Sequence, residues 1–220
     1  MSPKSTRELS NLLLLLCLSA IFLVHPHTTG FAWSRVLLDV LFTGPIALAI
    51  VAQSQLPRAT RGAFVALGVI ATLLTWAPPT LAGPLWLLPT AYTVFFGLCT
   101  AIYGWEIFRA AHVDAHILVR AAITYVFLGL AFAAAFALLV ALDPDAVLLP
   151  SESATPLADL TYFSFVTLTT LGYGDVLPQS GPARMLAVYE AIVGQLFVAV
   201  AVAVLVGLHV SNTRGPQPNP

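Results

Sequence analysis

Charged residues are scarce in this chain of 220 residues: Asp, Glu, Lys and Arg together make up 9%, and the net charge is −1. Soluble globular domains carry about 25% charged residues, so this scarcity excludes an ordinary soluble domain. Hydrophobic residues make up 59% of the chain, and the mean hydropathy is +0.90. These values predict an integral membrane protein. The near-zero net charge says little about partners, and we expect contact with membrane lipids and none with nucleic acid.

Cysteine and the usual catalytic motifs are rare as well. The two cysteines, Cys17 and Cys99, lie in apolar stretches, so we predict buried free thiols rather than a disulfide or a metal-binding pair. The sequence contains no phosphate-binding loop, no nucleophile triad and no cluster of metal ligands. We therefore predict that the protein is not an enzyme and needs no cofactor.

Long apolar runs divide the chain. A helix needs roughly 20 residues to cross about 30 Å of hydrocarbon. The runs that are long enough, or nearly so, are 9–24, 33–52, 62–77, 84–108, 117–141 and 183–210. The first run would also fit a secretory signal peptide, but we favour a retained helix. Another run, 157–169, is too short to cross. The pattern predicts an all-α membrane protein with six transmembrane helices and a re-entrant segment between the fifth and the sixth.

The stretch after this short run reads Thr169-Thr170-Leu171-Gly172-Tyr173-Gly174-Asp175. An ordinary strand alternates the direction of its carbonyl groups, whereas positive φ at alternate residues turns successive carbonyls the same way. Glycine takes positive φ at little steric cost, and Gly172 and Gly174 occupy alternate positions. Such a stretch can offer an ion a column of carbonyl oxygens, to which the Thr170 hydroxyl adds another. The alternative interpretation is a Gly-rich turn between two helices.

This stretch resembles the selectivity filter of the potassium channel family, whose signature is Thr-Val-Gly-Tyr-Gly, with Leu171 here in place of Val. The resemblance implies a filter in which rings of carbonyl oxygens bind permeant potassium ions. It also implies four copies around one axis, and hence a homotetramer. The implied potassium sites lie at Thr170, Leu171, Gly172 and Tyr173, and Gly174 completes the filter.

The resemblance covers residues 117–210, which we predict to be a pore domain of outer helix, pore helix, filter and inner helix. Thr155 and Pro156 suit the N-cap and the first position of the pore helix. The resemblance implies a hydrogen bond between Tyr162 and Asp175 behind the filter. The residues expected to support the filter are Tyr162, Phe163, Thr169 and Asp175.

The predicted inner helix contains the candidates for gating. Gly194 matches a hinge of the family, although it also fits a small residue at a close helix contact. Glu190 lies one turn earlier and inside the membrane, where a carboxylate is costly and usually paired or functional. We predict for it either a structural hydrogen bond to the pore helix or a gating or proton-sensing role. Ordinary core or lipid packing is the alternative for the residues that alignment with the family places along the cavity, which are Gln195, Val198, Val202 and Val206.

The distribution of basic residues predicts the topology. With a cytoplasmic N-terminus, only Arg35 and Arg184 lie outside, which agrees with the positive-inside rule. The residues on the inside are Lys4, Arg7, Arg58, Arg61, Arg109, Arg120 and Arg214. We predict a multi-pass protein of the cell membrane, with both termini cytoplasmic, and residue usage that suggests a bacterial plasma membrane. The predicted domains are a four-helix transmembrane domain, 1–116, the pore domain, 117–210, and a short cytoplasmic tail, 211–220.

Positive charge is missing from residues 84–108, which contain no Arg or Lys. A voltage-gated channel carries such residues at every third position of its fourth helix, so we predict that this protein has no conventional voltage sensor. We expect Arg35 and Asp39 to pair with each other or with a neighbour. Polar residues between 106 and 120 repeat every three or four positions, which predicts an interfacial helix with one polar, solvated face.

These features predict a potassium-selective channel that conducts passively. The alternatives are a weakly selective monovalent cation channel and, less favoured, a potassium transporter or a regulatory subunit. The filter sequence accounts for the ion that passes. The sequence predicts no stimulus that opens the pore.

Overall fold

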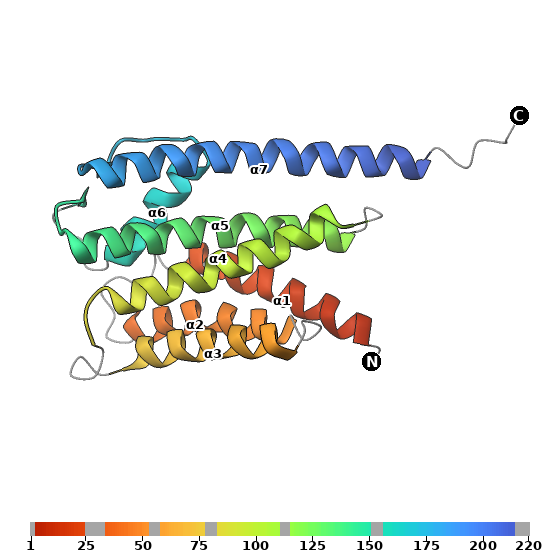
Figure 1. Ribbon diagram of the computed structural model, residues 1–220, viewed down its shortest axis with the longest axis horizontal. Helices are drawn as coiled ribbons and strands as arrows, with labels where there is room; N and C mark the ends of the chain where they lie inside the picture. The colour runs from red at the N-terminus through yellow and green to blue at the C-terminus, as the bar shows by residue number, and fades with distance from the viewer. Residues whose placement is uncertain are drawn as a thin grey trace, which may run out of the picture.

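A computed structural model of the protein describes residues 3–24, 34–52, 58–77, 83–110, 115–150 and 156–213. Every apolar run that the sequence marks forms a helix (Figure 1). The helices are α1 (Pro3–Val24), α2 (Ser34–Ala52), α3 (Arg58–Trp76), α4 (Leu87–Phe108), α5 (Ala115–Leu142), α6 (Pro156–Leu168) and α7 (Gly181–Thr213). The boundaries differ from the apolar runs mainly at α1, which begins in the polar residues before its run. Lys4, Arg7 and Glu8 have helix propensities close to that of leucine, so hydrophobicity does not mark the helix end.

The extended structure in the described residues is one antiparallel pair of two-residue strands. Strand β1 (Val147–Leu148) follows α5, and strand β2 (Leu177–Pro178) precedes α7. The backbone amide of Gln179 continues this contact by donating to the carbonyl of Ala146 at 2.8 Å. The pair therefore ties the loop after α5 to the loop that leads into α7.

Three helices are long and apolar enough to cross a membrane, counting only described residues: Leu87–Phe108, Ala115–Leu142 and Gly181–Gly207. Shorter apolar stretches lie at Glu8–Ala20, Thr43–Ala52 and Thr60–Trp76. The all-helical fold with these spans fits a membrane protein. Crossing by α4, α5 and α7 follows from length and composition, whereas crossing by α1, α2 and α3 stays a prediction.

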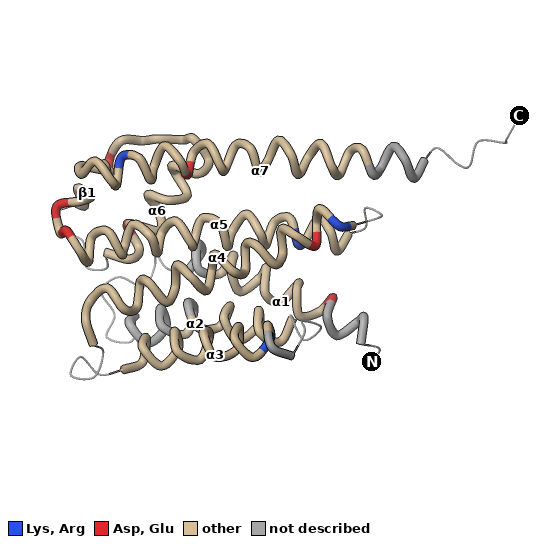
Figure 2. Tube along the Cα trace, viewed as in Figure 1, with Lys and Arg blue, Asp and Glu red and all other residues tan. Residues whose placement is uncertain are grey.

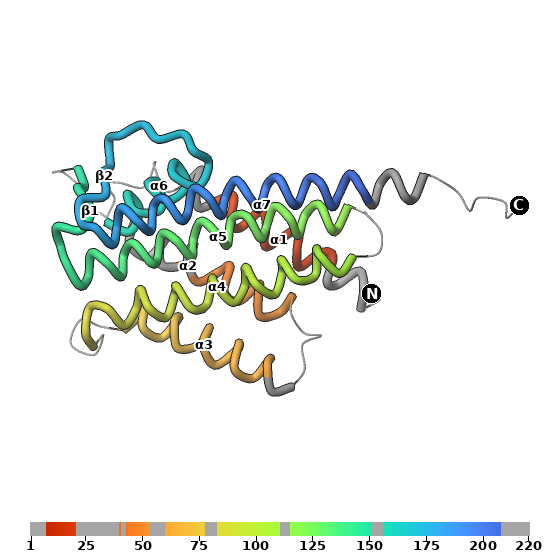
Figure 3. Tube along the Cα trace, turned by 45° about the horizontal axis from the view of Figure 1, so that its top comes forward, coloured from red at the N-terminus to blue at the C-terminus, as the bar shows by residue number. Residues whose placement is uncertain are grey.

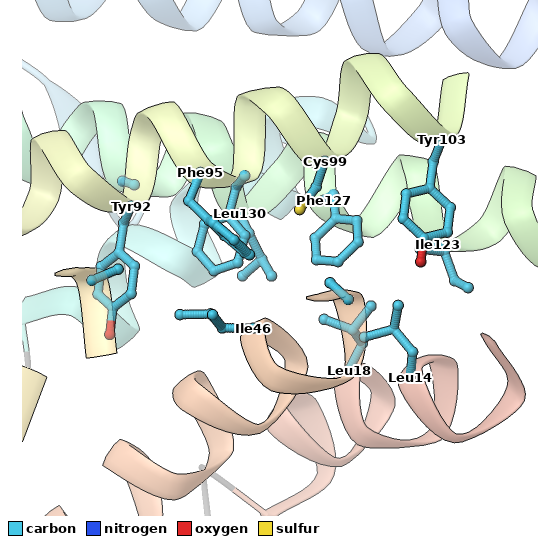
Figure 4. Packing of buried hydrophobic residues seen from close by; sticks show 14 of the residues in the cluster. Leu14, Leu18, Ile46, Tyr92, Phe95, Cys99, Tyr103, Ile123, Phe127 and Leu130 are labelled. Carbon is cyan, nitrogen blue, oxygen red and sulfur yellow. The ribbon is translucent and has the colours of Figure 1, made fainter. Parts of the chain in front are cut away.

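The largest buried cluster joins the first five helices. Figure 4 shows Leu14 and Leu18 of α1 and Ile46 of α2 beneath aromatic side chains of α4 and α5. Within the cluster, the ring of Phe95 lies 5.0 Å from that of Phe64 in α3, and the ring of Tyr103 lies 5.7 Å from that of Phe127 in α5. Helices α4 and α5 therefore form the middle layer, with α2 and α3 on one side and α6 and α7 on the other (Figures 1 and 3).

The two cysteines follow the prediction only in part. Both are free, and Cys99 is buried inside the cluster of α4 and α5. Cys17 of α1 is only half-buried, so the expectation that both thiols are buried is wrong for it. Its sulfur lies close to Gly44 of α2, since a Cβ built on this glycine would lie 3.1 Å from it.

Most of the length of the helices carries no charged residue (Figure 2). The start of α3, the end of α4 and the start of α5 lie at one end of the bundle, and the start of α7 lies at the other (Figures 1 and 3). Arg61, Arg109 and Arg120 belong to the first of these ends and Arg184 to the second. The arrangement is compatible with the predicted topology. The side chains of Arg35 and Asp39, whose pairing is predicted, lie outside the described residues.

The predicted interfacial helix between residues 106 and 120 is corrected by the structure. Glu106 belongs to α4 and Arg120 to α5, while Arg109 and Ala110 are not helical and residues 111–114 are not among those described. Glu106 and Arg120 instead face each other from the ends of two antiparallel helices. Arg120 Nη1 lies 3.1 Å from Glu106 Oε2, and the side chains are 14% and 24% exposed.

Two further polar contacts connect α1 to this end of the bundle. His116 Nε2 of α5 lies 2.8 Å from Glu8 Oε1, with both side chains about one-third exposed. The hydroxyl of Tyr103 in α4 donates to Asn11 Oδ1 at 3.3 Å. His116 therefore has a partner from α1, rather than lying on an isolated solvated face.

We expect Arg120→Met to lower the free energy of unfolding by about 2 kcal/mol, between the values for surface and buried ion pairs. The substitution removes the cation beside Glu106 but leaves a carboxylate that is mostly buried. Unfolding of the purified protein in detergent measures the loss. The double variant Glu106→Gln/Arg120→Met should lose less than the single variant, because no charge then remains. An equal or larger loss in the double variant contradicts this account.

Candidate functional site

The short helix α6 lies between α5 and α7 (Figure 1). It has 13 residues, begins at Pro156 and has Asp159 in its first turn. At 1.5 Å per residue it is about 20 Å long, too short to cross about 30 Å of hydrocarbon. Proline suits a first helical position because its missing N–H has no partner there, and Asp159 complements the positive end of the helix dipole. Thr155, the predicted N-cap, lies outside the described residues.

Helix α6 ends in a Schellman motif. The backbone amide of Thr170 donates to the carbonyl of Thr167 at 2.9 Å, and that of Leu171 donates to the carbonyl of Val166 at 2.8 Å. Thr170 is in the left-handed region, with φ of 60°. This conformation is uncommon for a β-branched residue, and glycine usually takes it at a helix end. The sequence therefore contains no local signal for it.

Positive φ recurs at every second residue after α6. The values are 60° at Thr170, 58° at Gly172 and 79° at Gly174, while Leu171 and Tyr173 do not have positive φ. The positive φ predicted at the two glycines is confirmed, and Thr170 extends the alternation by one residue. Because the hand of the backbone changes at each step, successive carbonyl groups can point to the same side.

This stretch, defined as the filter segment (residues 170–174), is uncovered in a single chain. Leu171 is 54% exposed and Tyr173 is 67% exposed. A Cβ built on Gly172 or Gly174 would meet no atom within 4 Å. The segment therefore has an open face on which an ion or another copy of the chain has room to lie.

Tyr162 of α6 holds the end of the filter segment. Its hydroxyl donates to Asp175 Oδ2 at 2.7 Å, which is the contact predicted between these residues. Donation to this carboxylate raises the pKa of Tyr162 to about 12, so the phenol keeps its proton and remains a donor. The contact joins the middle of α6 to the residue that follows the filter segment.

The other two predicted supports make contacts elsewhere. Phe163 is buried, and its ring packs against that of Phe136 in α5 at 4.8 Å between centroids. The Thr169 hydroxyl donates to the carbonyl of Phe165 at 2.6 Å, within the last turn of α6. Phe163 thus packs α6 against α5, and the Thr169 hydroxyl satisfies a carbonyl group in the last turn of α6. Direct bracing of the filter segment by either side chain is not seen.

Helix α7 approaches the end of α6 at Gly194. A Cβ built on Gly194 would lie 2.5 Å from the carbonyl oxygen of Leu168, the last residue of α6. The sequence allows Gly194 to be either a hinge or a small residue at a close helix contact. The structure directly supports the close contact. Helix α5 approaches similarly, since a Cβ on Gly129 would lie 2.5 Å from the ring of Phe165.

A buried polar contact joins the same three helices. The Ser164 hydroxyl oxygen of α6 lies 2.7 Å from the carbonyl oxygen of Gly129 in α5 and 2.5 Å from Glu190 Oε1 in α7. The hydrogen bond predicted between Glu190 and the pore helix is therefore present. Glu190 is fully buried, with 0% of its surface exposed.

The remaining inner-helix candidates lie on the uncovered side of α7. Gln195 Nε2 donates to the Thr170 hydroxyl at 3.4 Å, which places Gln195 at the beginning of the filter segment. Farther along α7, Val198 is 43% exposed, Val202 is 53% exposed and Val206 is 55% exposed. These side chains form an apolar face that one chain leaves open, and their predicted cavity and gating roles stay predictions.

The comparisons concern this same part of the chain. Residues 124–210 match the model of a family described as "Ion channel". The match runs from α5 through α6 and the filter segment into α7, which is less than half of the chain. No curated protein and no solved structure matches the chain. The match supports an ion channel in a membrane rather than an enzyme, and within the described residues no group of three potential metal-ligating side chains occurs.

Three features of the site escape sequence reasoning. These are the left-handed Thr170, the acceptor carbonyl of Gly129 and the hydroxyl of Ser164 between two helices. A backbone carbonyl leaves no signal in the sequence, and a serine in an apolar helix has many uses. The contacts of Gly129 and Ser164 can be assigned only once the structure shows that α5 and α7 both pack against α6.

We expect Gly194→Ala to destabilise the protein by about 1–3 kcal/mol, because its methyl group would overlap a backbone atom of Leu168 and force α7 away from α6. The midpoint of thermal unfolding in detergent measures the effect. Gly97→Ala in α4 is the matched control, since a Cβ there would meet nothing within 4 Å. Equal midpoints for the two variants would show that the close approach is not required.

Proposed function

We propose that this chain is the subunit of a potassium-selective channel that conducts K⁺ passively through the filter segment. The observation that carries the proposal is the positive φ at Thr170, Gly172 and Gly174. This alternation is what a column of carbonyls facing one side requires, and such carbonyls can replace the hydration shell of a cation. The Thr170 hydroxyl adds an oxygen at the end nearest α6. The family match supports the coarser part of the proposal, an ion channel.

Four copies of the chain complete the pore in this proposal. One filter segment supplies only one side of a ring, so closure requires further copies around an axis. Two observations support a homotetramer: the filter segment is open in one chain, and α7 exposes an apolar face. In addition to the valines below Gln195, the exposed side chains of α7 include Val188, Ile192, Leu196 and Val200. Neighbouring subunits and lipid would cover them.

Helix α6 acts in this proposal as a re-entrant pore helix. Its carbonyl end leads into the filter segment, so the negative end of its dipole favours a cation nearby. Irregular backbone at membrane depth is tolerated only where protein or an aqueous cavity surrounds it. In the proposed tetramer, the other subunits and the ion pathway surround the filter segment. The proposed location is the cell membrane, with both termini in the cytoplasm.

The absence of Arg and Lys from α4 (Leu87–Phe108) supports a channel without a conventional voltage sensor. A weakly selective monovalent cation channel is the second candidate, because the same alternation of φ would serve it. Selectivity among monovalent cations separates the two. A potassium transporter or a regulatory subunit is less favoured, since an open filter segment with its alternation intact suits passive conduction.

Purified protein in lipid vesicles tests the proposal. With K⁺ on one side and Na⁺ on the other, we expect a reversal potential that follows the K⁺ gradient, because the carbonyl column selects the permeant ion. A reversal potential near zero would favour the weakly selective channel. Flux that requires a second, coupled ion gradient would favour a transporter, and no flux at all would favour a regulatory subunit.

We expect Gly172→Ala to abolish potassium selectivity or current, because an L-residue in the left-handed region costs about 1–2 kcal/mol and the alternation would be lost. Gly181→Ala is the matched control: residue 181 begins α7, is exposed and has no atom within 4 Å of a built Cβ. The control should conduct as the wild type does. Unchanged selectivity and current in Gly172→Ala would refute the assignment of the filter segment.

A further inference from the structure

Glu190 is a carboxyl side chain with an unusual set of neighbours. It lies in α7 and is fully buried within a single chain, so no neighbouring subunit is needed to remove it from solvent. Its Oε1 contacts the hydroxyl of Ser164, and its Oε2 is buried with no hydrogen-bond partner among the described residues. The ion pairs found among these residues, Glu8–His116 and Glu106–Arg120, do not involve it.

The hydroxyl of Ser164 lies between two oxygens but has only one hydrogen. One oxygen is the carbonyl of Gly129 at 2.7 Å, and the other is Glu190 Oε1 at 2.5 Å. A carbonyl oxygen can only accept, and an ionised carboxylate can only accept as well. If Ser164 donates to Gly129, the short contact with Glu190 needs a hydrogen from the carboxyl group. A neutral Glu190 supplies it, and the chain of donors is then complete.

The charged form fits these surroundings poorly. Among the described residues, an ionised carboxylate would keep one oxygen buried without a partner and would face no cation, which is the costly arrangement for a buried charge. In the neutral form, the oxygen that has no partner is an uncharged carbonyl oxygen, and its desolvation costs far less. The number of hydrogens available for these contacts and the burial of the side chain therefore both favour the neutral form of Glu190.

We infer that Glu190 keeps its proton and is a positioning residue for ion conduction, donating to Ser164 while Ser164 donates to Gly129. This inference rests on the proposed function and adds a residue to it that touches no permeant ion. The bridge connects α7 through α6 to α5 (Figure 1). It thereby fixes the position of α6 relative to the two helices that flank it.

The position of α6 determines where the filter segment begins. Ser164 lies one turn before Leu168, at which α6 ends, and Gly194 lies one turn after Glu190 on α7. The Leu168 carbonyl packs against Gly194 and accepts a hydrogen bond from the Tyr125 hydroxyl of α5 at 3.4 Å. The bridge and this contact thus hold α6 at two successive turns. The left-handed Thr170 follows two residues later.

Infrared spectroscopy of the protein in lipid vesicles tests the protonation state without any need for conduction. We expect the difference spectrum of the wild type minus Glu190→Gln to show the C=O stretching band of a protonated carboxylic acid. It should show no loss of a carboxylate band. Loss of a carboxylate band instead would overturn the inference, whatever the channel conducts.

Permeability measurements test the positioning role. We expect Glu190→Gln to keep the ratio of potassium to sodium permeability, since its amide N–H can donate to Ser164 as the acid does. Glu190→Ala and Ser164→Ala should each lower the ratio about tenfold, the effect of losing one buried hydrogen bond. Ser19→Ala is the control for the serine variant, because the Ser19 hydroxyl is exposed and donates to the carbonyl of Leu15 within its own helix α1. The control should keep the wild-type ratio.

The outcomes separate failure of this inference from failure of the proposed function. A wild type that does not select potassium refutes the proposed function, while the infrared result on Glu190 still stands. A selective wild type whose ratio survives in Glu190→Ala and Ser164→Ala refutes the positioning role alone. A response of the wild-type current to pH below neutral that disappears in Glu190→Gln also overturns the inference, because it would reveal a carboxyl group that is already ionised at neutral pH.

Discussion

Successive backbone carbonyls point to one side only where negative and positive φ alternate along the chain. Most residues that have a side chain disfavour positive φ. Gly172 and Gly174 accept the left-handed positions easily, but Thr170 does not. Its conformation is held by the end of α6, where the amides of Thr170 and Leu171 satisfy carbonyls of the last turn. The geometry of the filter segment therefore depends on how α6 ends, and on what keeps α6 in place.

Two helices, α5 and α7, keep α6 in place. Glycines on α5 and α7 let these helices approach Phe165 and the carbonyl of Leu168 more closely than any larger residue would allow. In a membrane, such close approach replaces the hydrophobic drive that holds soluble helices together. The polar contact of Ser164 with Gly129 and Glu190 adds direction, because a hydrogen bond limits sliding and rotation in a way that apolar packing does not.

The first three helices and α4 form a cluster beside the three helices that hold the filter segment. This apolar cluster packs on α5 through Phe95, Tyr103 and Phe127. The contacts Glu8–His116, Glu106–Arg120 and Tyr103–Asn11 lie at the end opposite the filter segment. Helix α5 packs against α1, α4 and α6, so a displacement of α1 or α4 at that end can reach α6 through α5. If the channel responds to a stimulus sensed by these helices, α5 is placed to transmit it.

The sequence by itself determined the membrane class, the location of the seven helices, the short length of α6 and the positive φ of Gly172 and Gly174. Each of these depends on local properties, namely the length of apolar runs and the steric freedom of glycine. The sequence did not reveal the left-handed Thr170, the partners of Ser164, or the facing ends of α4 and α5, which its polar periodicity presented as one helix. Only the tertiary structure decided these features, because each arises where segments far apart in the chain meet, and spacing along one segment carries no information about what lies across from it.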